Sequence, residues 1–134
     1  MPKLKNPTVK QLKNILWKNY VSPYIRQRDK GKCFTCGVMK DWKEMQAGHF
    51  IPRGSYSDTM YDETNLHCQC PKCNTYLGGN LTEYAIKMID KYGREYVDEL
   101  RFRGRQTKKW TREELKDLIE IYKTKLENLN EERN

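Results

Sequence analysis

The sequence predicts an α+β fold that is mostly helical, in which short strands and turns lie between N-terminal and C-terminal helices. Two capping boxes, Thr8 with Gln11 and Thr111 with Glu114, each precede apolar residues that recur at helical spacing. Residues 33–73 lack that period, and Gly, Pro, Asp and Ser interrupt them, which is typical of turns and short strands. The length of 134 residues is that of one domain.

The N-terminal part of the chain is predicted to be an arm followed by helix. Residues 1–7 are basic and contain proline, so we expect an arm with little regular structure. The helical segment covers residues 8–32. It kinks or restarts at Ser22-Pro23, because Ser caps helices well and Pro suits a first helical turn.

The central segment, residues 33–92, is predicted to hold two strands. They cover residues 47–51 and 65–70, and a polar loop over residues 52–64 joins them. The two strands are short, so this segment needs a further source of stability beyond its own core.

Helices are expected again after the second strand. One begins near Pro71 or Asn74 and another near Leu81, and residues 93–134 form a C-terminal helical extension. A short apolar patch precedes the last helix and consists of Val97, Leu100 and Phe102. The apolar stripe of the last helix either packs on the domain or pairs with a second copy of the chain, and the sequence leaves both interpretations open. The stripe consists of Leu115, Leu118, Ile119, Tyr122, Leu126 and Leu129.

Composition indicates a polyanionic partner and a cytosolic location. The formal net charge is +8 and the pI is about 9.2, an excess that suits nucleic acid, although a merely soluble surface would also explain it. No apolar run is long enough to cross a membrane, and the first residues lack the apolar block of a secretory signal. We therefore expect the cytosol, where thiols stay reduced and bind metals.

Two Cys-x-x-Cys pairs predict one structural zinc ion, bound by Cys33, Cys36, Cys70 and Cys73. Two residues between cysteines let both sulfurs of a tight turn face one point, and two such turns supply four tetrahedral thiolates. The alternatives are a redox Cys-x-x-Cys and buried free cysteines. Cys68 competes as a ligand, since on a strand it would point the same way as Cys70. We prefer Cys70 because it completes the second turn.

Several runs between and around the cysteines resemble a known family. They are AGHFIPRG at residues 47–54, DETNLH at 62–67, QCPKCN at 69–74 and GN at 79–80. Taken in this order, they look like the phage NinG (Rap) recombination nucleases, which belong to the HNH, or ββα-metal, endonuclease superfamily. The resemblance covers roughly residues 10–102 and adds little on the final helix. If a phage encodes the chain, the expected compartment is the host cytoplasm.

The resemblance implies a zinc-bound ββα-metal core over residues 33–92 and one catalytic cation, Mg²⁺ or Mn²⁺. His49 matches the histidine that activates the attacking water. Asn65 matches the asparagine that braces the loop and orients that histidine. Asn74 matches the position that faces the metal, and its carboxamide oxygen suits a hard cation.

One position departs from the HNH pattern. Many HNH enzymes carry an Asp metal ligand just before the general base, and this chain has Gly48 there. A second ligand must therefore come from elsewhere, and the sequence does not rank the alternatives. They are His67, which would share a strand face with Asn65, and Asn80, Asp62 and Glu63.

The expected function is metal-dependent cleavage of DNA, with branched substrates such as Holliday junctions or D-loops implied by the family. Arg53 is expected to contact a phosphate, and Arg26 and Arg28 are expected on the surface or at the DNA backbone. A non-catalytic zinc module that binds nucleic acid is the alternative, and a scaffold that assembles through its last helix is a third. Junction-cleaving enzymes often act as two-fold dimers, so a homodimer through that helix is a further expectation.

Overall fold

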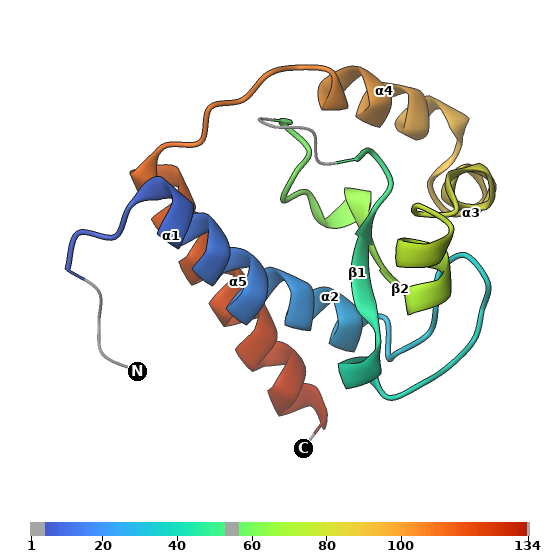
Figure 1. Cartoon of the computed structure of the whole chain (residues 1–134), viewed down its shortest axis with the longest axis horizontal. Coiled ribbons are helices and arrows are strands. Elements are labelled where there is room, and N and C mark those ends of the chain that lie inside the picture. The colour runs from blue at the N-terminus through green and yellow to red at the C-terminus, as the bar shows by residue number, and fades with distance from the viewer. Residues whose placement is uncertain (1–4, 53–56, 134) are drawn as a thin grey trace. The chain divides into compact units, whose positions relative to one another are not determined.

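Two separate units make up the fold of this chain, in a computed structural model that describes residues 5–52 and 57–133 (Figure 1). The first unit combines both ends of the chain, up to residue 24 and from residue 109 onward. The second unit covers residues 25–108. Among the described residues, no helix has the length and apolar character that a membrane crossing requires. The segments predicted from the sequence follow chain order, whereas these units do not.

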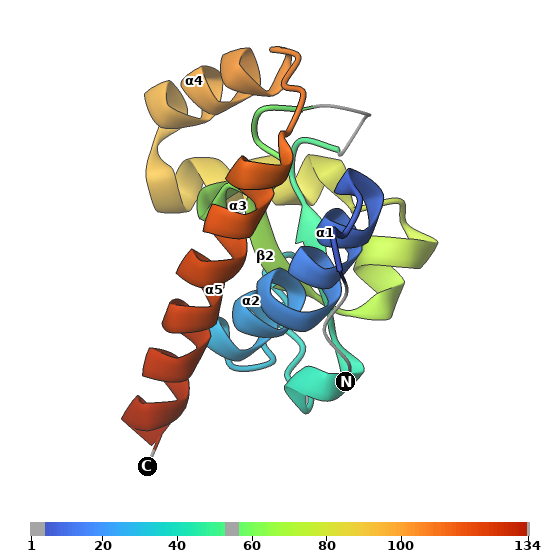
Figure 2. The ribbon, with the colours of Figure 1, turned by 90° about the vertical axis from the view of Figure 1, so that its left-hand side faces the viewer.

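The first unit consists of helices from the two ends of the chain. Helix α1 (Val9–Ile15) begins at the predicted capping box, in which the Thr8 hydroxyl accepts from the Gln11 N–H at 3.1 Å. A π-helical stretch (Leu16–Val21) and α2 (Ser22–Arg28) continue it. Helix α5 (Arg112–Arg133) packs along α1 and the π-helical stretch (Figure 2).

The apolar stripe of α5 is used within the chain. Every residue of the predicted stripe is buried or half-buried, and Leu115 and Tyr122 are the most enclosed. The Tyr122 ring meets the Tyr24 ring edge-on, with centroids 5.8 Å apart. The stripe therefore packs at least in part within the chain, as the first of the two interpretations has it, and pairing with a second copy stays a prediction.

The predicted interruption at Ser22-Pro23 takes a gentler form than a kink or a restart. The Ser22 N–H donates to the carbonyl of Trp17, five residues back, and the helical path then continues through Pro23. A proline has no N–H to place in the usual helical ladder. The wider π-helical turn before it accommodates that missing bond without a break.

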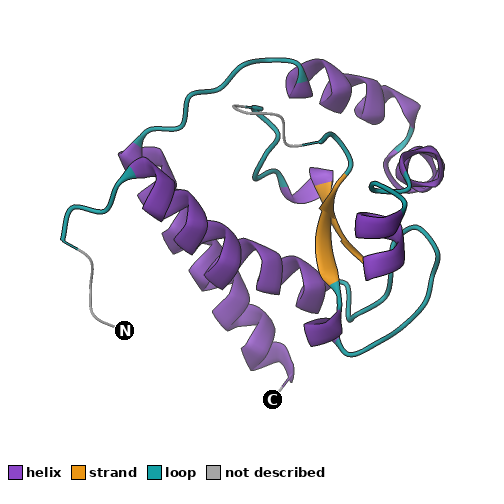
Figure 3. Cartoon of the chain, in the orientation of Figure 1, coloured by secondary structure: helices purple, strands orange, loops and turns teal. Residues whose placement is uncertain are grey.

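The second unit is built on a two-stranded antiparallel sheet of β1 (Gln46–His49) and β2 (Leu66–Gln69), as predicted (Figure 3). Gly48 lies opposite His67 in this register. Two short 3₁₀ turns precede the strands, at residues 42–44 and 63–65. The strands are short, and helices cover the rest of the core.

Three helical segments follow the sheet. A π-helical turn (Lys72–Tyr76) comes directly after β2, and α3 (Leu81–Tyr92) begins where the sequence predicts a helix. Helix α4 (Arg94–Gly104) lies in the predicted helical extension, although its own bounds were not predicted and its residues were described as a short apolar patch. Just two of its residues are fully buried, and Phe102 is 63% exposed, so its apolar face is too narrow to give a periodic signal. The core beneath these helices consists of Phe50, Tyr84, Met88, Val97 and Leu100.

Candidate functional site

Four cysteine sulfurs meet at one point of the second unit. The Sγ atoms of Cys33, Cys36, Cys70 and Cys73 all lie within 4.8 Å of one another, and those of Cys36 and Cys70 are 3.7 Å apart. A tetrahedral zinc site with Zn–S bonds of about 2.3 Å separates its sulfurs by about 3.8 Å. The predicted cluster is therefore confirmed, and its geometry could hold a metal ion such as zinc.

Hydrogen-bond donors around Cys33 favour its thiolate, whereas burial raises the pKa of Cys73. Burial raises the pKa of Cys33, but the Thr35 hydroxyl and the backbone N–H groups of Cys36, Cys70 and Thr35 lower it to about 6. The Asn80 side chain donates to Cys73 Sγ at 3.6 Å from a left-handed backbone conformation, with φ of 49°. These donors stabilise negative sulfur, which is the form that binds a metal.

Cys36 shows how close neighbouring sulfurs oppose the ionisation of a thiol. The Val38 N–H lowers the pKa of Cys36, whereas burial and the three neighbouring sulfurs raise it to about 12. Sulfurs this close repel one another when they are all negative. A bound cation would remove that repulsion.

Cys68 lies outside the cluster, in the middle of β2. Its side chain is fully buried, and burial raises the pKa of its thiol to about 12. Its backbone N–H donates to Asp29 Oδ2 at 2.8 Å, and its carbonyl accepts from the Phe34 N–H at 2.8 Å. Cys70 rather than Cys68 therefore completes the group of four.

His49 lies at the end of β1, where the chain enters the loop to β2. Its Nε2 lies 2.9 Å from the carbonyl oxygen of Met60. A carbonyl can only accept, so Nε2 carries the hydrogen, and the lone pair of the neutral ring is on Nδ1. The ring is thus held in one tautomer by the far end of the loop.

Asn65 joins two segments of that loop through its side-chain hydrogen bonds. Its side chain is fully buried. Its Oδ1 accepts from the Ile51 N–H at 2.7 Å, and its Nδ2 donates to the carbonyls of Ile51 and Thr59, each at 3.1 Å. One carboxamide therefore ties the first part of the loop to its last part, next to the carbonyl that holds His49.

Gly48 provides room for two carboxamide oxygens. A Cβ added at Gly48 would lie 1.8 Å from Gln69 Oε1 and 3.0 Å from Asn74 Oδ1. The amide group of Gln69 donates to the Gly79 carbonyl at 2.8 Å, which fixes its orientation and turns its oxygen toward Gly48. That oxygen is buried and meets no hydrogen-bond donor among the described residues. Asn74 is held by a bond from its Nδ2 to Gln46 Oε1 at 2.8 Å.

Gln69 is a residue that the sequence reasoning missed. Strand alternation carries the signal, since residues 67 and 69 share one face of β2 and residue 48 lies opposite residue 67 on the partner strand. The predicted strand and its period contain this information.

His67 has both ring nitrogens engaged inside the core. Tyr84 donates its hydroxyl hydrogen to the Gly48 carbonyl at 2.8 Å, so His67 Nδ1 donates to Tyr84 at 3.0 Å. His67 Nε2 then accepts from the Tyr92 hydroxyl at 2.8 Å, and the ring stacks on Phe34 at 3.9 Å. Burial lowers the pKa of His67 to about 3, so the ring is neutral. This environment has no place for a cation on the ring.

Two of the other residues considered as second cation ligands, Asp62 and Asn80, have structural partners for their side chains, and Glu63 is contacted through its backbone carbonyl. Asp62 Oδ1 accepts from the N–H and the hydroxyl of Thr64, and its Oδ2 pairs with Arg103. Burial raises the pKa of Asp62, but these donors outweigh it and the pKa is lowered. Asn80 supports Cys73, and the Glu63 carbonyl accepts from Arg28 at 3.0 Å.

Arg26 and Arg28, two of the arginines expected on the surface or at the DNA backbone, have partners within the fold. Arg28 donates to the carbonyls of Glu63 and Leu66, at 3.0 and 2.7 Å, and to the carboxylate of Asp29. Arg26 reaches the carbonyls of Trp42 and Met45, and its guanidinium lies over the Trp42 ring. Both therefore hold distant segments together in this structure. Arg53 lies outside the described residues.

Comparison with known proteins identifies relatives of this chain. A family model for the bacteriophage lambda NinG protein matches residues 3–132. The ninG proteins of Escherichia phage lambda, Escherichia phage 933W and Salmonella phage P22 are each 33% identical to this chain over 114 residues. These alignments cover 84% of the chain and 55% or 56% of each relative, so the chain spans just over half the length of the curated relatives it matches. No solved structure is significantly similar. The chain therefore belongs to the NinG family of bacteriophage proteins.

Proposed function

We propose that this chain is a metal-dependent DNA endonuclease of the HNH type, acting on branched recombination intermediates such as Holliday junctions and D-loops. The observation that carries the proposal is the bond from His49 Nε2 to the Met60 carbonyl, which leaves the lone pair of the neutral ring on Nδ1. A histidine held in one tautomer is oriented as a general base before its substrate binds.

The proposed reaction begins at His49. Its Nδ1 accepts a proton from a water molecule while the water oxygen attacks the scissile phosphorus. A new P–O bond forms, the bond from phosphorus to the leaving oxygen breaks, and that oxygen takes a proton from solvent. His49 then returns its own proton to solvent. Asn65 acts as a positioning residue, because it fixes the loop segment that holds the ring.

A catalytic cation such as Mg²⁺ or Mn²⁺ would be bound by Asn74 and Gln69. Both offer carboxamide oxygens on the Gly48 side of the sheet, and that of Gln69 is a buried acceptor with no donor among the described residues. Oxygen ligands suit hard cations. When bound, the cation would offset the negative charge of the phosphate in the transition state.

The cysteine cluster has a separate role in this proposal. Zinc on four thiolates has no open coordination position, so it acts as a structural ion. It would hold the turn before β1 against the start of the π-helical turn that carries Asn74. The formal net charge of +8 supports a nucleic-acid substrate.

Cleavage of defined DNA substrates tests the proposal. The protein is incubated with linear, nicked and four-way DNA in the presence of Mg²⁺ or Mn²⁺, and compared with His49→Ala. Circular dichroism and zinc content establish that the variant is folded. We expect the wild type to cut the four-way substrate and the folded variant to lose at least about 100-fold in rate. Absence of cleavage by the wild type with either metal would overturn the proposal.

One observation favours a second candidate, a zinc-stabilised module that binds DNA without cutting it. The cation site described above contains no carboxylate, since Gly48 stands where many HNH enzymes have Asp. This candidate predicts salt-dependent DNA binding that His49→Ala leaves unchanged, together with no cleavage by the wild type. The same substrates and the same variant therefore decide between the two functions.

A further inference from the structure

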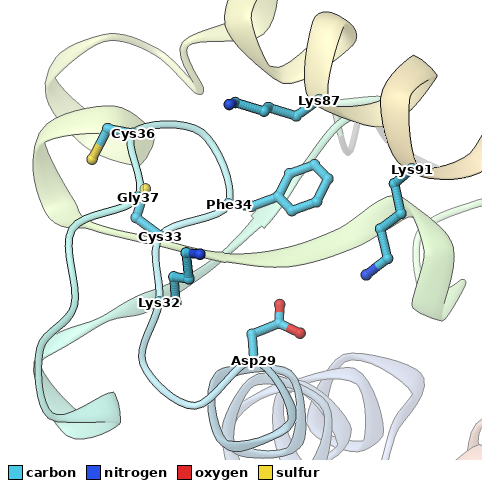
Figure 4. Close-up of a pocket in the computed structure, with 8 residues that line it drawn as sticks. All are labelled: Asp29, Lys32, Cys33, Phe34, Cys36, Gly37, Lys87 and Lys91. Atoms are coloured by element: carbon cyan, nitrogen blue, oxygen red, sulfur yellow. The ribbon is translucent and has the colours of Figure 1, made fainter.

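A pocket of about 420 Å³ lies beside the first cysteine turn, at a distance along the chain from the residues of the proposed reaction (Figure 4). Lys87 and Lys91, one turn apart on α3, line one side of it, and Lys32 and Asp29 line the other. The Phe34 ring lies between these groups. No role in the fold or in the proposed reaction accounts for this combination.

The pocket is positively charged. Three lysines line it with one carboxylate, which is already neutralised, because Arg28 donates to both oxygens of Asp29 at 2.8 and 3.1 Å. Cys33 and Cys36 also line it, and four thiolates with one zinc ion share a net charge of about −2, so the three lysines still outweigh the negative charge at the pocket. Within the part of the chain that the structure describes, the ammonium groups of Lys32 and Lys87 form no ion pair. Ammonium groups on the walls of a hollow favour an anionic ligand.

The Phe34 ring indicates which class of anion the pocket would bind. One face of Phe34 stacks on His67, with centroids 3.9 Å apart, and this packing holds the ring rigid. Lys91 Nζ lies 5.7 Å from the centroid of the same ring. An inorganic anion needs no aromatic surface, whereas a nucleotide presents a phosphate to ammonium groups and a flat base to a ring. A pocket of this size also belongs to the range that binds small organic groups.

The pocket is joined to the sheet of the proposed active site. The Phe34 N–H donates to the Cys68 carbonyl on β2 at 2.8 Å, and His67, on which Phe34 stacks, lies opposite Gly48. A DNA strand held in the pocket would therefore be bound by the same small sheet that ends in His49.

We propose that this pocket binds one unpaired nucleotide of a DNA strand, with its phosphate at Lys32, Lys87 and Lys91 and its base against Phe34. This inference deepens the proposed function, because it gives a reason for branched substrates. A base inside an intact duplex must first be unpaired and unstacked to enter such a pocket, which costs free energy, whereas branch points and gaps already expose unpaired nucleotides.

DNA binding by the full chain tests the inference. Fluorescence anisotropy measures Kd for an intact duplex and for a duplex with a short single-stranded gap, in the His49→Ala background so that the DNA stays uncut. The test variant is Lys87→Gln/Lys91→Gln. The control is Lys10→Gln/Lys18→Gln, which changes the net charge equally on exposed lysines of the other unit. Both variants are checked for zinc content and thermal unfolding.

We expect the test variant to bind gapped DNA roughly tenfold more weakly than the control does at low salt. Its plot of log Kd against log salt should lose a slope of up to about 1.4, since each phosphate contact on a single strand is worth about 0.7. Phe34→Leu should weaken binding to gapped DNA and leave the salt slope unchanged, because stacking releases no counterions. The preference for gapped over intact DNA should disappear in both.

An equal loss in the test and control variants, or a preserved preference for gapped DNA, would overturn the inference. Failure of the proposed function is seen separately. If the wild type never cleaves DNA, binding in the pocket still reports on the inference. If the wild type cleaves and the lysine variant binds as the control does, only the inference fails.

Discussion

His49 and Asn65 are linked through two successive carbonyl groups of the loop between the strands. Asn65 Nδ2 donates to the carbonyl of Thr59 at 3.1 Å, and His49 Nε2 donates to the carbonyl of Met60 at 2.9 Å. The buried asparagine fixes the chain at one residue, and the histidine ring is oriented by the next. We therefore expect a conformational change at Asn65 to alter the orientation of His49 through the backbone.

Replacing Asn65 tests this link. Asn65→Ala removes the partner of the Ile51 N–H and of the Ile51 carbonyl, and leaves the Thr59 carbonyl with the Asp62 N–H, so the free energy of unfolding should fall by about 2–4 kcal/mol. In the folded fraction the His49 ring should gain mobility, seen as a shifted and broadened imidazole resonance in NMR spectra. Asn14→Ala, at an exposed position of α1, is the matched control and should change stability by less than about 0.5 kcal/mol. A sharp, unshifted His49 resonance in Asn65→Ala would contradict the link.

The cysteine assignment is tested by metal content. We expect one zinc ion per chain, bound by Cys33, Cys36, Cys70 and Cys73. Cys70→Ser should bind zinc far more weakly and unfold at a lower temperature, since metal binding contributes directly to folding. Cys68→Ser should keep its zinc, because that sulfur lies outside the cluster. Atomic absorption after dialysis measures both, and the opposite result for the two variants would refute the assignment.

The contact between Gly48 and Gln69 predicts a coupled effect on stability. Gly48→Ala places a Cβ 1.8 Å from Gln69 Oε1, so one of the two groups must move, at a cost of about 1–3 kcal/mol. In the Gln69→Ala background the same substitution should cost much less, which gives a coupling energy above about 1 kcal/mol. Urea unfolding of the four proteins measures the cycle. Additive effects would show that the two side chains do not compete for this space.

The buried His67 predicts a dependence of stability on pH. The pKa of His67 is about 3 in the folded chain and about 6.5 in the unfolded chain. Below pH 6.5 the unfolded chain therefore takes up a proton that the folded chain does not. Stability should therefore fall as pH falls, and His67 alone should account for about 1.4 kcal/mol between pH 7.5 and 5.5. His67→Gln should lack this part of the dependence. Urea unfolding of both zinc-loaded proteins at the two pH values measures the difference, and parallel pH profiles would exclude the effect.

Local patterns predicted much of this fold. The Thr8 and Thr111 capping boxes form as expected, because each needs only residues three positions apart. The cysteine pairs were predictable for a similar reason, since each turn is local and the chemistry of four thiolates then brings the two turns together.

Long-range polar contacts could not be predicted in the same way. From sequence alone Arg28 is expected to be a surface cation. Its partners are the backbone carbonyls of Glu63 and Leu66, which lie far along the chain, and a backbone carbonyl cannot be predicted from the residue type. The two tyrosines that enclose His67 are likewise distant in sequence. Such contacts depend on which helices and strands pack together, and the local sequence pattern does not predict that packing.

The order of the cysteines along the chain has a consequence for assembly of the protein. Both strands, the loop between them, His49 and Asn65 all lie within the stretch from Cys33 to Cys73. An ion bound to the four sulfurs closes this stretch into a ring, and closing a ring of about 40 residues removes about 4 kcal/mol of chain entropy from the unfolded state. Binding of one metal ion would thus decide when a newly made chain forms the loop that orients His49. Formation of the site would then depend on the supply of that metal.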